Sequence, residues 1–464
     1  MYSKKYYIPI FILLVYFQTI FAWPNSGPSD VVKEFFENLK NGRLDPAIQL
    51  LSVEARLNTN KIFSNLSIDE SQFREIELIE TKKENIKKNT ANCLMSFRLK
   101  RMRFPEFMLF ELSKEDGKWK IRKIESKKSQ SIKVDELLVN NKGAIFIYTA
   151  EQLLSSIDNG NTWIKVYHPN TTFTAMSAAP NGDLYAWILG CKHHKNEIIT
   201  PDYTGSYCLI KSKDNGINWD IISKQKDNLI KIIFDKVGNI YGMSLNQLYK
   251  SNDDGNTWEL ICQIKPPADF DFITVNSNDE PMWAYSSVKY KSTAWSSGAY
   301  RSDGHIEMIS KEFGRIPVFN NEQSIKKIFT TPNNQVLVQT EKSLFYTEND
   351  FNEWKEIPNK IQGNELISIA INDLGEFYAL SFKNGFYKLN QLILNWSLLH
   401  QENNFFIGHN FNFIFTEDNQ IIGYFDDGEP SCSDGVIYSN DQGRTWIQIF
   451  SPVEWFLLQK MEID

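Results

Sequence analysis

An eight-residue pattern that recurs four times constrains this fold more than any other feature of the sequence. The pattern has Ser, Asp, Gly and Trp at its first, third, fifth and eighth positions. The four copies are residues 156–163 (SIDNGNTW), 212–219 (SKDNGINW), 251–258 (SNDDGNTW) and 439–446 (SNDQGRTW). A degraded copy at 347–354 (TENDFNEW) retains the final Trp. Such self-similarity predicts a chain built from repeated structural units.

Short turn sequences followed by β-rich runs extend the repeat to seven units. They are Asn141–Gly143, Pro180–Gly182, Val237–Asn239, Asn278–Asp279, Asn333–Asn334, Leu374–Gly375 and Asp418–Asn419. The spacing from Trp163 to Trp446 gives about 47 residues per unit, which suits a four-stranded propeller blade. The 12 Trp and 14% aromatic residues also favour strands. We therefore expect a mainly β protein with a seven-bladed β-propeller over residues 130–450.

The expected blades follow from these two markers. They cover residues 130–168, 172–224, 229–264, 269–312, 324–358, 365–399 and 408–450. The fourth and sixth blades carry no copy of the eight-residue pattern.

The eight-residue pattern resembles the Asp-box, or bacterial neuraminidase repeat, of sialidases, vacuolar-sorting receptors, xyloglucanases and photosystem-assembly factors. In a tight turn, the Asp accepts backbone hydrogen bonds, Gly supplies a positive φ and Trp packs between neighbouring sheets. The turn joins the third and fourth strands of a blade, so repeated copies cannot converge on one substrate. We expect a structural role for Asp158, Gly160, Trp163, Asp214, Gly216, Trp219, Asp253, Gly255, Trp258, Asp441, Gly443 and Trp446.

The first residues have the pattern of a secretory signal peptide. Lys4 and Lys5 precede an apolar run over 6–22, and Trp23-Pro24 follow. We expect residues 1–22 to be a signal peptide cleaved near Ala22, and the chain to be periplasmic, cell-surface or secreted. An uncleaved membrane anchor is the alternative, because the run is close to the shortest length that spans a bilayer.

Charge separates the chain into two parts. Residues 28–128 carry 21 Lys+Arg and 16 Asp+Glu, whereas residues 129–464 carry 27 and 41. Because the two parts differ in charge, we expect two domains, joined by a polar linker at 126–131. The overall net charge of −7 argues against nucleic-acid binding.

Residues 28–126 read as a small α+β roll. An amphipathic helix starts at Pro28 with Ser29 or Asp30 as its cap, a second covers about 45–51, and strands follow near 73–80, 92–103, 106–113 and 119–124. Helices followed by a meander ending in Asp116-Gly117 and KWKIRKI resemble the nuclear-transport-factor-like (cystatin-like) folds. That fold includes both enzymes and binding modules, so it implies no single function. We expect the C-terminal tail, residues 451–464, to pack on the propeller.

Long connections between second and third strands mark the expected binding face. They cover residues 191–207, 289–298 and 426–434, and insertions on one face of a repeat protein usually mark its binding side. Their aromatic and charged residues suit recognition of a protein or glycan. The candidate binding residues are His193, His194, Asp202, Tyr203, Tyr290, Trp295, Asp426, Asp427 and Glu429.

Catalysis is not expected. The resemblance to sialidases implies three substrate-binding arginines and an Arg-Ile-Pro motif before the first box. The propeller contains only Arg301, Arg315 and Arg444, and its Arg315-Ile316-Pro317 falls between the fourth and fifth expected blades. A glycoside hydrolase of another type, acting at the channel mouth through Asp202, Asp426, Asp427 or Glu429, stays open as the alternative.

Cysteine spacing favours a disulfide over a metal site. Cys191 and Cys208 flank the longest insertion on neighbouring antiparallel strands, which suits a bridge in an exported chain. Paired zinc-ligand spacings are absent, so we expect no metal and no cofactor. Of five cysteines at least one stays unpaired, and we expect Cys93 to be a buried thiol. The sequence thus predicts an exported, non-catalytic binding or scaffold protein.

Overall fold

The structure of the protein is a computed structural model that describes most of the chain from residue 27 to residue 463. The described residues are 27–66, 70–100, 106–125, 134–149, 152–166, 173–189, 192–194, 197–199, 207–225, 227–265, 268–292, 297–310, 314–331, 333–348, 351, 353–361, 364–372, 374–381, 385–401, 410–416, 418–426 and 435–463. The predicted leader lies outside them. Over these ranges, no helix has the length and apolar character needed to cross a bilayer.

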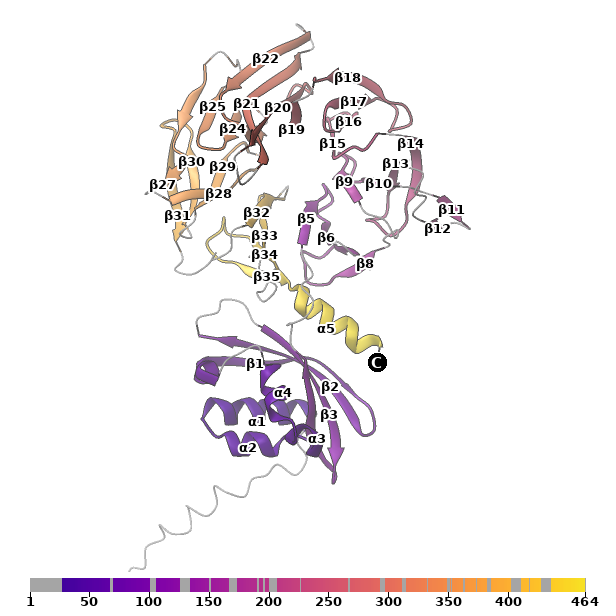
Figure 1. The fold of residues 1–464 in the computed structure, drawn as a ribbon, viewed down its shortest axis with the longest axis vertical. Coiled ribbons are helices and arrows are strands. Elements are labelled where there is room, and N and C mark those ends of the chain that lie inside the picture. Colours follow the sequence, from indigo (N-terminus) through magenta and orange to yellow (C-terminus); the bar gives the residue numbers. More distant parts are fainter. Residues whose placement is uncertain are drawn as a thin grey trace, which may run out of the picture. The chain divides into compact units, whose positions relative to one another are not determined.

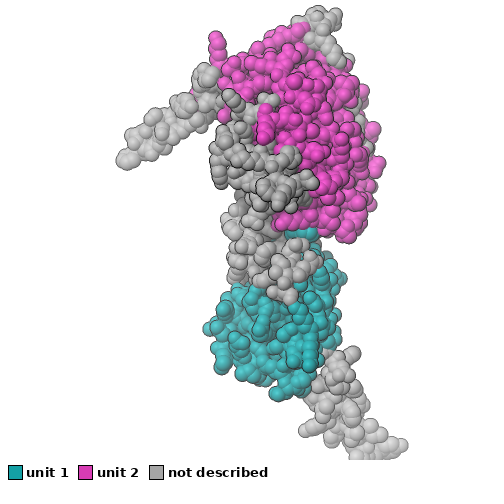
Figure 2. Space-filling view, turned by 90° about the vertical axis from the view of Figure 1, so that its right-hand side faces the viewer, with its two compact units in different colours: residues 1–130, 453–464 teal, residues 131–452 magenta. Residues whose placement is uncertain are grey.

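The chain divides into two compact units (Figure 2). Unit 1 comprises residues 1–130 together with 453–464, and unit 2 comprises residues 131–452. The sequence therefore enters unit 2 after residue 130 and returns to unit 1 for its last residues.

Unit 1 begins with a buried amphipathic helix. Its helical segments are α1 (Pro28–Lys40), α2 (Leu44–Gln49), α3 (Val53–Arg56), α4 (Thr59–Ser64) and the 3₁₀ helix η2 (Glu70–Glu75). Val32, Phe35 and Phe36 of α1 are completely buried, as expected for apolar residues spaced along one helix face. The predicted cap, Ser29 or Asp30, is wrong because Pro28 takes the first helical position and makes Gly27 the N-cap. Asp30 instead accepts a hydrogen bond from the Gly27 backbone N–H (3.1 Å).

An antiparallel sheet completes the core of unit 1. Its strands, in spatial order, are β1 (Ile76–Ile86), β2 (Thr90–Leu99), β3 (Glu106–Glu115) and β4 (Lys118–Glu125). Phe36 packs against Phe97 and Phe110, with ring centroids 5.8 and 5.7 Å apart, so α1 covers one face of the sheet. The predicted helix-then-meander order is confirmed, including the turn at Asp116-Gly117, where both residues have positive φ.

The last helix, α5 (Pro452–Ile463), is part of unit 1. Its Val453, Leu457 and Met461 form a buried cluster with side chains of β2 and β3. The expectation that this segment packs on the propeller is therefore wrong. A short apolar segment suits any apolar face, and nothing in its residue types specifies which face it will cover.

Unit 2 is built from antiparallel sheets, each drawn from one continuous stretch of chain. The first three sheets are β5 (Val134–Val139), β6 (Ile145–Thr149), β7 (Gln152–Ser156) and β8 (Ile164–Val166); β9 (Phe173–Ala178), β10 (Leu184–Leu189), β13 (Tyr207–Ser212) and β14 (Asp220–Gln225); and β15 (Lys231–Phe234), β16 (Ile240–Met243), β17 (Gln247–Ser251) and β18 (Glu259–Gln263). A separate pair, β11 (Lys192–His194) and β12 (Glu197–Ile199), lies between β10 and β13 in the chain.

The remaining sheets of unit 2 repeat this order. They are β19 (Ala268–Val275), β20 (Pro281–Ser292), β21 (Ser297–Ser310) and β22 (Gly314–Asn321); β23 (Ile325–Thr330), β24 (Val336–Thr340), β25 (Leu344–Thr347) and β26 (Lys355–Ile357); β27 (Lys360–Ile361), β28 (Asn364–Ile371), β29 (Phe377–Ser381), β30 (Gly385–Asn390) and β31 (Asn395–Gln401); and β32 (Asn410–Phe415), β33 (Ile421–Asp426), β34 (Gly435–Ser439) and β35 (Ile447–Phe450).

Contacts between inner strands join successive sheets. Contacts run from β5 through β9, β15, β19, β23 and β28 to β32, and β33 contacts β5. Figure 1 shows the sheets arranged around a common centre, with β5, β9, β15, β19, β28 and β32 nearest to it. Radially arranged four-stranded antiparallel sheets are the architecture of a β-propeller, which confirms the mainly β propeller fold.

The predicted short turns join the first and second strands of the sheets. In the first sheet the Gly143 N–H donates to the Asn140 carbonyl (3.0 Å), and in the last the Asn419 N–H donates to the Thr416 carbonyl (2.9 Å). Gly143 and Asn419 both have positive φ, 76° and 56°. Gly and Asn tolerate this conformation best, which is why these turns were recognisable from residue type.

The fourth sheet contains one strand more than the sequence predicts. The fourth expected blade ends at residue 312, but its fourth strand is β22, and Arg315-Ile316-Pro317 lies inside that strand rather than between blades. No eight-residue motif marks the preceding turn, and Pro317 argues against a strand. Proline is tolerated because β22 is the last strand of its sheet, where an N–H can stay unpaired.

Candidate functional site

The eight-residue motifs occupy turns between third and fourth strands, as predicted. In residues 439–446, Asp441 Oδ1 accepts hydrogen bonds from Ser439 Oγ (2.8 Å) and the Thr445 N–H (2.8 Å), and Oδ2 accepts from Thr445 Oγ1 (2.6 Å). The Gly443 N–H donates to Ser439 Oγ (2.9 Å). The same set recurs in the other three motifs, with Asn218 in place of Thr in the second. Each carboxylate is therefore engaged within its own turn.

These hydrogen bonds keep the motif carboxylates ionised. The Thr162 hydroxyl, the Thr162 N–H and the Ser156 hydroxyl lower the pKa of Asp158. The N–H and hydroxyl of Thr257 likewise lower the pKa of Asp253. Lowered pKa values and internal hydrogen bonds are the opposite of what a general acid requires. No group of three metal-ligating side chains occurs in the described part of the chain.

The tryptophans of the motifs pack against the preceding sheet. Trp163 donates from Nε1 to the Ile449 carbonyl (2.8 Å) of β35, and its ring lies 5.1 Å from that of Phe450. Trp258 packs edge-on against Trp187 (5.7 Å) and Trp446 against Phe386 (6.0 Å). The motif therefore connects neighbouring sheets, and in the first sheet it connects to the last.

A cavity of about 440 Å³ opens among the turns between first and second strands. Strands alternate in direction, so these turns and the eight-residue motifs lie at one end of the propeller, here called the turn end, whereas connections from second to third strands lie at the loop end. Residues from four sheets line the cavity, among them Asn140, Asn141, Ser177, Pro180, Phe234 and Phe415. None of the described lining side chains is charged.

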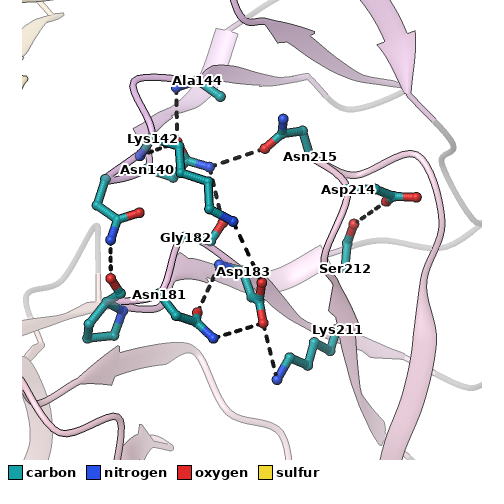
Figure 3. Close-up of polar contacts among 12 residues, drawn as sticks. Asn140, Lys142, Ala144, Asn181, Gly182, Asp183, Lys211, Ser212, Asp214 and Asn215 are labelled. Atoms are coloured by element: carbon teal, nitrogen blue, oxygen red, sulfur yellow. Dashed lines mark hydrogen bonds and ion pairs between the residues drawn. The ribbon is translucent and has the colours of Figure 1, made fainter.

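A polar network beside this cavity connects the first two sheets (Figure 3). Asn140 donates from Nδ2 to the Gly182 carbonyl (3.1 Å) and to Asn215 Oδ1 (3.3 Å). Its own Oδ1 accepts from the Lys142 and Ala144 N–H groups (3.1 and 2.9 Å). The Asn140 side chain therefore has a partner for both its donor and its acceptor groups.

A buried lysine extends the network to the third sheet. Lys211 Nζ lies 3.3 Å from Asp183 Oδ2 and 3.0 Å from Asp254 Oδ2. Burial lowers the pKa of Lys211, but its hydrogen bonds to Tyr185 and Asp254 outweigh burial and leave the pKa raised. Burial and the carboxylate of Asp254 raise the pKa of Tyr185 to about 12. Asn140, Asp183 and Lys211 are not among the predicted site residues, although Asn140 and Asp183 directly adjoin the predicted turns at Asn141–Gly143 and Pro180–Gly182.

The predicted loop residues lie partly outside the described residues. Asp202, Tyr203, Trp295, Asp427 and Glu429 are among those not described. His193 and His194 lie in β11, Tyr290 in β20 and Asp426 at the end of β33.

Two of the predicted insertions contain β-hairpins. Within residues 191–207, β11 pairs with β12 from Lys192–Ile199 to His194–Glu197. Strands β20 and β21 continue pairing as far as Ser292 and Ser297, beyond the last pair that β20 makes with β19, at Ser287. Lys289 and Asp303 form an ion pair across this hairpin (2.6 Å). Both hairpins belong to connections between second and third strands and so lie at the loop end.

The cysteines fall into bonded and free groups. Cys208 is disulfide-bonded, whereas Cys93 and Cys262 are free and buried. The buried thiol predicted at Cys93 is confirmed. Cys191 lies outside the described residues, so its pairing with Cys208 stays a prediction.

Arg315, from the Arg-Ile-Pro tripeptide, contacts side chains of two neighbouring strands of its own sheet, β20 and β21. Its Nε donates to Glu307 Oε2, and its guanidinium carbon lies 5.8 Å from the centroid of the Trp283 ring. Glu307 also accepts a hydrogen bond from the Tyr285 hydroxyl (3.1 Å). This arginine is therefore occupied by a neighbouring carboxylate.

Comparisons with known proteins identify similar folds only. No protein-family model and no curated protein matches the chain. Among solved structures, virginiamycin B lyase from Staphylococcus aureus is 12% identical with a TM-score of 0.45, covering 64% of this chain and 94% of its own. YCF48 from Cyanidioschyzon merolae is 11% identical with a TM-score of 0.41, covering 67% and 95%. The WD40 β-propeller domain of Doa1 is 7% identical with a TM-score of 0.42, covering 68% and 95%.

Proposed function

We propose that this chain is an exported, non-catalytic binding protein that recognises a protein or glycan partner through the loop end of a seven-bladed Asp-box propeller. The blade number is supported by the seven sheets of four or more strands formed by the described residues of unit 2, and by the contact between β33 and β5. The Asp-box assignment is supported by four turns with the same hydrogen bonds. These bonds engage each carboxylate within its own turn, so the carboxylates have a structural role.

The observation that carries the proposal is that the connections between strands are short at the turn end of the propeller and longer at the loop end. At the turn end, the connections are short and hydrogen-bond within themselves or to a neighbouring sheet. At the loop end, the second and fourth sheets carry β-hairpins, and the third predicted insertion, residues 426–434, belongs to the same kind of connection. Binding residues concentrate on loops that a rigid scaffold positions.

The test is capture of a partner from the native envelope or secretome. We expect the combined change Tyr203→Ala, Trp295→Ala and Asp427→Ala to abolish capture, because aromatic and charged residues carry most binding energy at such surfaces. The matched control is Ile217→Ala, Val237→Ala and Leu374→Ala, which removes exposed side chains from turns at the opposite end. Equal capture by both triple variants would contradict the proposal.

The rival function is a glycoside hydrolase of a non-sialidase type at the channel mouth. Purified protein should show no turnover of aryl-glycosides or polysaccharides. Turnover that disappears on changing Asp202, Asp426, Asp427 or Glu429 to Asn or Gln would establish the enzyme instead.

Export rests on residues 1–22, and we propose cleavage near Ala22. N-terminal sequencing of the mature protein should begin shortly after that residue. A mature chain that retains Met1 and sediments with membranes would instead indicate an uncleaved anchor, the one case in which a membrane would be a partner.

The proposed Cys191–Cys208 bridge is supported by the bonded state of Cys208. Such a bridge would close the longest insertion and stabilise the fold by about 3 kcal/mol. Peptide mapping without reduction should recover the two cysteines together. A bridge from Cys208 to Cys432 would overturn the pairing.

We also propose that residues 28–126 form a nuclear-transport-factor-like domain, supported by helices that cover one face of a four-stranded meander. We assign this domain no activity.

A further inference from the structure

Unit 1 also contains a cavity of about 440 Å³, at the end of α1 that leads into α2. Helix α1 contacts both α2 and η2, and these three elements with the α1–α2 turn supply the walls. The lining residues are Leu39, Gly42, Leu44, Ser71, Phe73 and Arg74. The volume lies within the range of about 300–1,000 Å³ that is usual for small-molecule sites.

The turn between α1 and α2 keeps one wall of the cavity free of side chains. The Gly42 N–H donates to the Leu39 carbonyl (3.0 Å), and the Arg43 N–H donates to the Asn38 carbonyl (2.8 Å). Gly42 has a φ of 69°, and a Cβ added there would have no other atom within 4 Å. The backbone of this turn is therefore hydrogen-bonded within the chain, and side chains of the other walls determine what the cavity can hold.

One wall of the cavity is apolar and incompletely buried. Leu39 and Phe73 belong to the core of unit 1 and are only 3% and 7% exposed, whereas Leu44 is 45% exposed. Folding therefore leaves part of the Leu44 side chain in contact with water. An aliphatic group placed in the cavity would cover this surface, and burial of apolar surface is favourable.

The charged group of the cavity is Arg74, which lies on the exposed side of η2. Within the described ranges of the chain, its guanidinium forms no ion pair and no hydrogen bond. By contrast, Arg122 pairs with Glu111 (2.7 Å) and Arg98 pairs with Glu77 (3.4 Å) in the same unit. None of the described lining residues is acidic. A guanidinium without a partner is suited to bind a carboxylate through two parallel hydrogen bonds.

We propose that this cavity is a binding site for a small monocarboxylate with a linear aliphatic chain. Arg74 holds the carboxylate, and Leu39, Leu44 and Phe73 contact the chain. One guanidinium balances the single charge of a carboxylate, whereas a phosphate monoester carries more than one negative charge at neutral pH. The site is separate from the loop end of the propeller and adds a ligand to a domain that has no assigned activity.

The test is calorimetric titration of the full-length protein with octanoate. We expect saturable binding at one site. From butanoate to octanoate, the affinity should rise about fourfold with each added methylene, because each methylene buries further apolar surface. Octanamide has the same chain without the charge, and it should bind at least about tenfold more weakly.

Three variants locate the site. Arg74→Ala should weaken octanoate binding at least about tenfold, because it removes a charge-assisted hydrogen-bond donor. Leu44→Asp should abolish binding, because it replaces part of the apolar wall with a like charge. Arg43→Ala is the matched control, since Arg43 is an exposed cation of the same turn that does not line the cavity, and it should change the affinity less than about twofold. Arg74 and Leu44 are both exposed, so the melting temperatures of these variants should stay close to that of the unchanged chain.

Hydrogen exchange provides a second readout, because octanoate should slow exchange over residues 38–44 and 70–75 and leave unit 2 unchanged. Absence of saturable binding would overturn the proposal, as would protection confined to other segments. Binding that survives both Arg74→Ala and Leu44→Asp would overturn it too, because octanoate would then occupy another site. Equal affinity for octanoate and octanamide, or equal losses in Arg43→Ala and Arg74→Ala, would remove the role of Arg74. Capture of a partner by the loop end is independent of all these outcomes.

Discussion

In the seventh and sixth sheets of the propeller, the turn between the last two strands leads into a tryptophan, and we call this turn and its tryptophan a corner. The two corners are built with different hydrogen bonds. In the seventh, the turn before Trp446 has the full eight-residue motif, and the indole donates to the Gly443 carbonyl (3.0 Å) within the turn. In the sixth, the turn before Trp396 has neither the Asp nor the Gly, and the indole donates to the Pro358 carbonyl (2.8 Å), which lies between β26 and β27. Both indoles are buried. The buried tryptophan is common to both corners, and the aspartate turn is one of two ways to support it.

Removal of either indole should have the largest effect. We expect Trp446→Ala and Trp396→Ala each to lower the free energy of unfolding by about 3–5 kcal/mol, because each leaves a large cavity between sheets. Urea unfolding followed by circular dichroism measures both. A much smaller loss at Trp396 would show that the corner without the motif depends on other contacts.

The motif glycine should be the next most sensitive position. A Cβ at Gly443 would lie 2.6 Å from Phe386 Cδ1, and the residue has a φ of 80°. We expect Gly443→Ala to cost about 2–4 kcal/mol from strain and overpacking together. Gly42→Ala is the matched control, since Gly42 also has positive φ but no atom within 4 Å of an added Cβ. The control isolates the cost of strain, and equal losses at both sites would remove the packing argument.

The motif aspartate should matter less than the residues it supports. Asp441→Ala removes the acceptor for Ser439 Oγ, the Thr445 N–H and Thr445 Oγ1, and we expect a loss of about 1–2 kcal/mol. In the sixth sheet, Asn390 accepts from the N–H groups of Leu392 and Ile393 at 3.1 and 3.4 Å. Asn390→Ala should cost less than Asp441→Ala in the same unfolding assay, and the reverse order would contradict the comparison.

The smallest expected difference between corners with and without the aspartate is the loss of stability in acid. The pKa values of Asp158 and Asp253 are lowered from 3.8 in the folded chain, so their contribution to stability is complete above that value and is lost as pH falls through the lower folded pKa. We expect the melting temperature to change little from pH 7 to 5 and to fall below pH 4. The combined change Asp158→Asn and Asp253→Asn should weaken the fall below pH 4, and an unchanged pH profile would show that other carboxylates cause it.

Local chemistry made much of unit 2 predictable. Positive φ at Gly143 and Gly182 and the Ser-Asp-Gly-Trp spacing each restrict the backbone within a few residues, so residue type identifies the turn. Strand β22 was missed because its turn carries no such signature and Pro317 argues against pairing.

Contacts between distant segments were not predictable in this way. The docking of Leu457 on Phe107, the cavity beside Asn140 and the ion pairs of Lys211 each depend on elements that the chain brings together from far apart. Hydrophobicity predicts that apolar side chains such as Leu457 and Phe107 will be buried, but it does not identify their partners. The same limit applies to the candidate site, where the sequence indicates which connections are long but gives no geometry for Tyr203 or Trp295.

The bond from Trp163 to the Ile449 carbonyl has a consequence for how the molecule is made. It joins residues 286 positions apart, and none of the described strands pairs across that junction. Nearly all of unit 2 must be synthesised before its two ends can meet, and loop-closure entropy over such a span makes that encounter slow. Until the first and last sheets meet, the aromatic side chains that form this contact are exposed on both. The nascent protein is therefore most prone to self-association just before these two sheets come together.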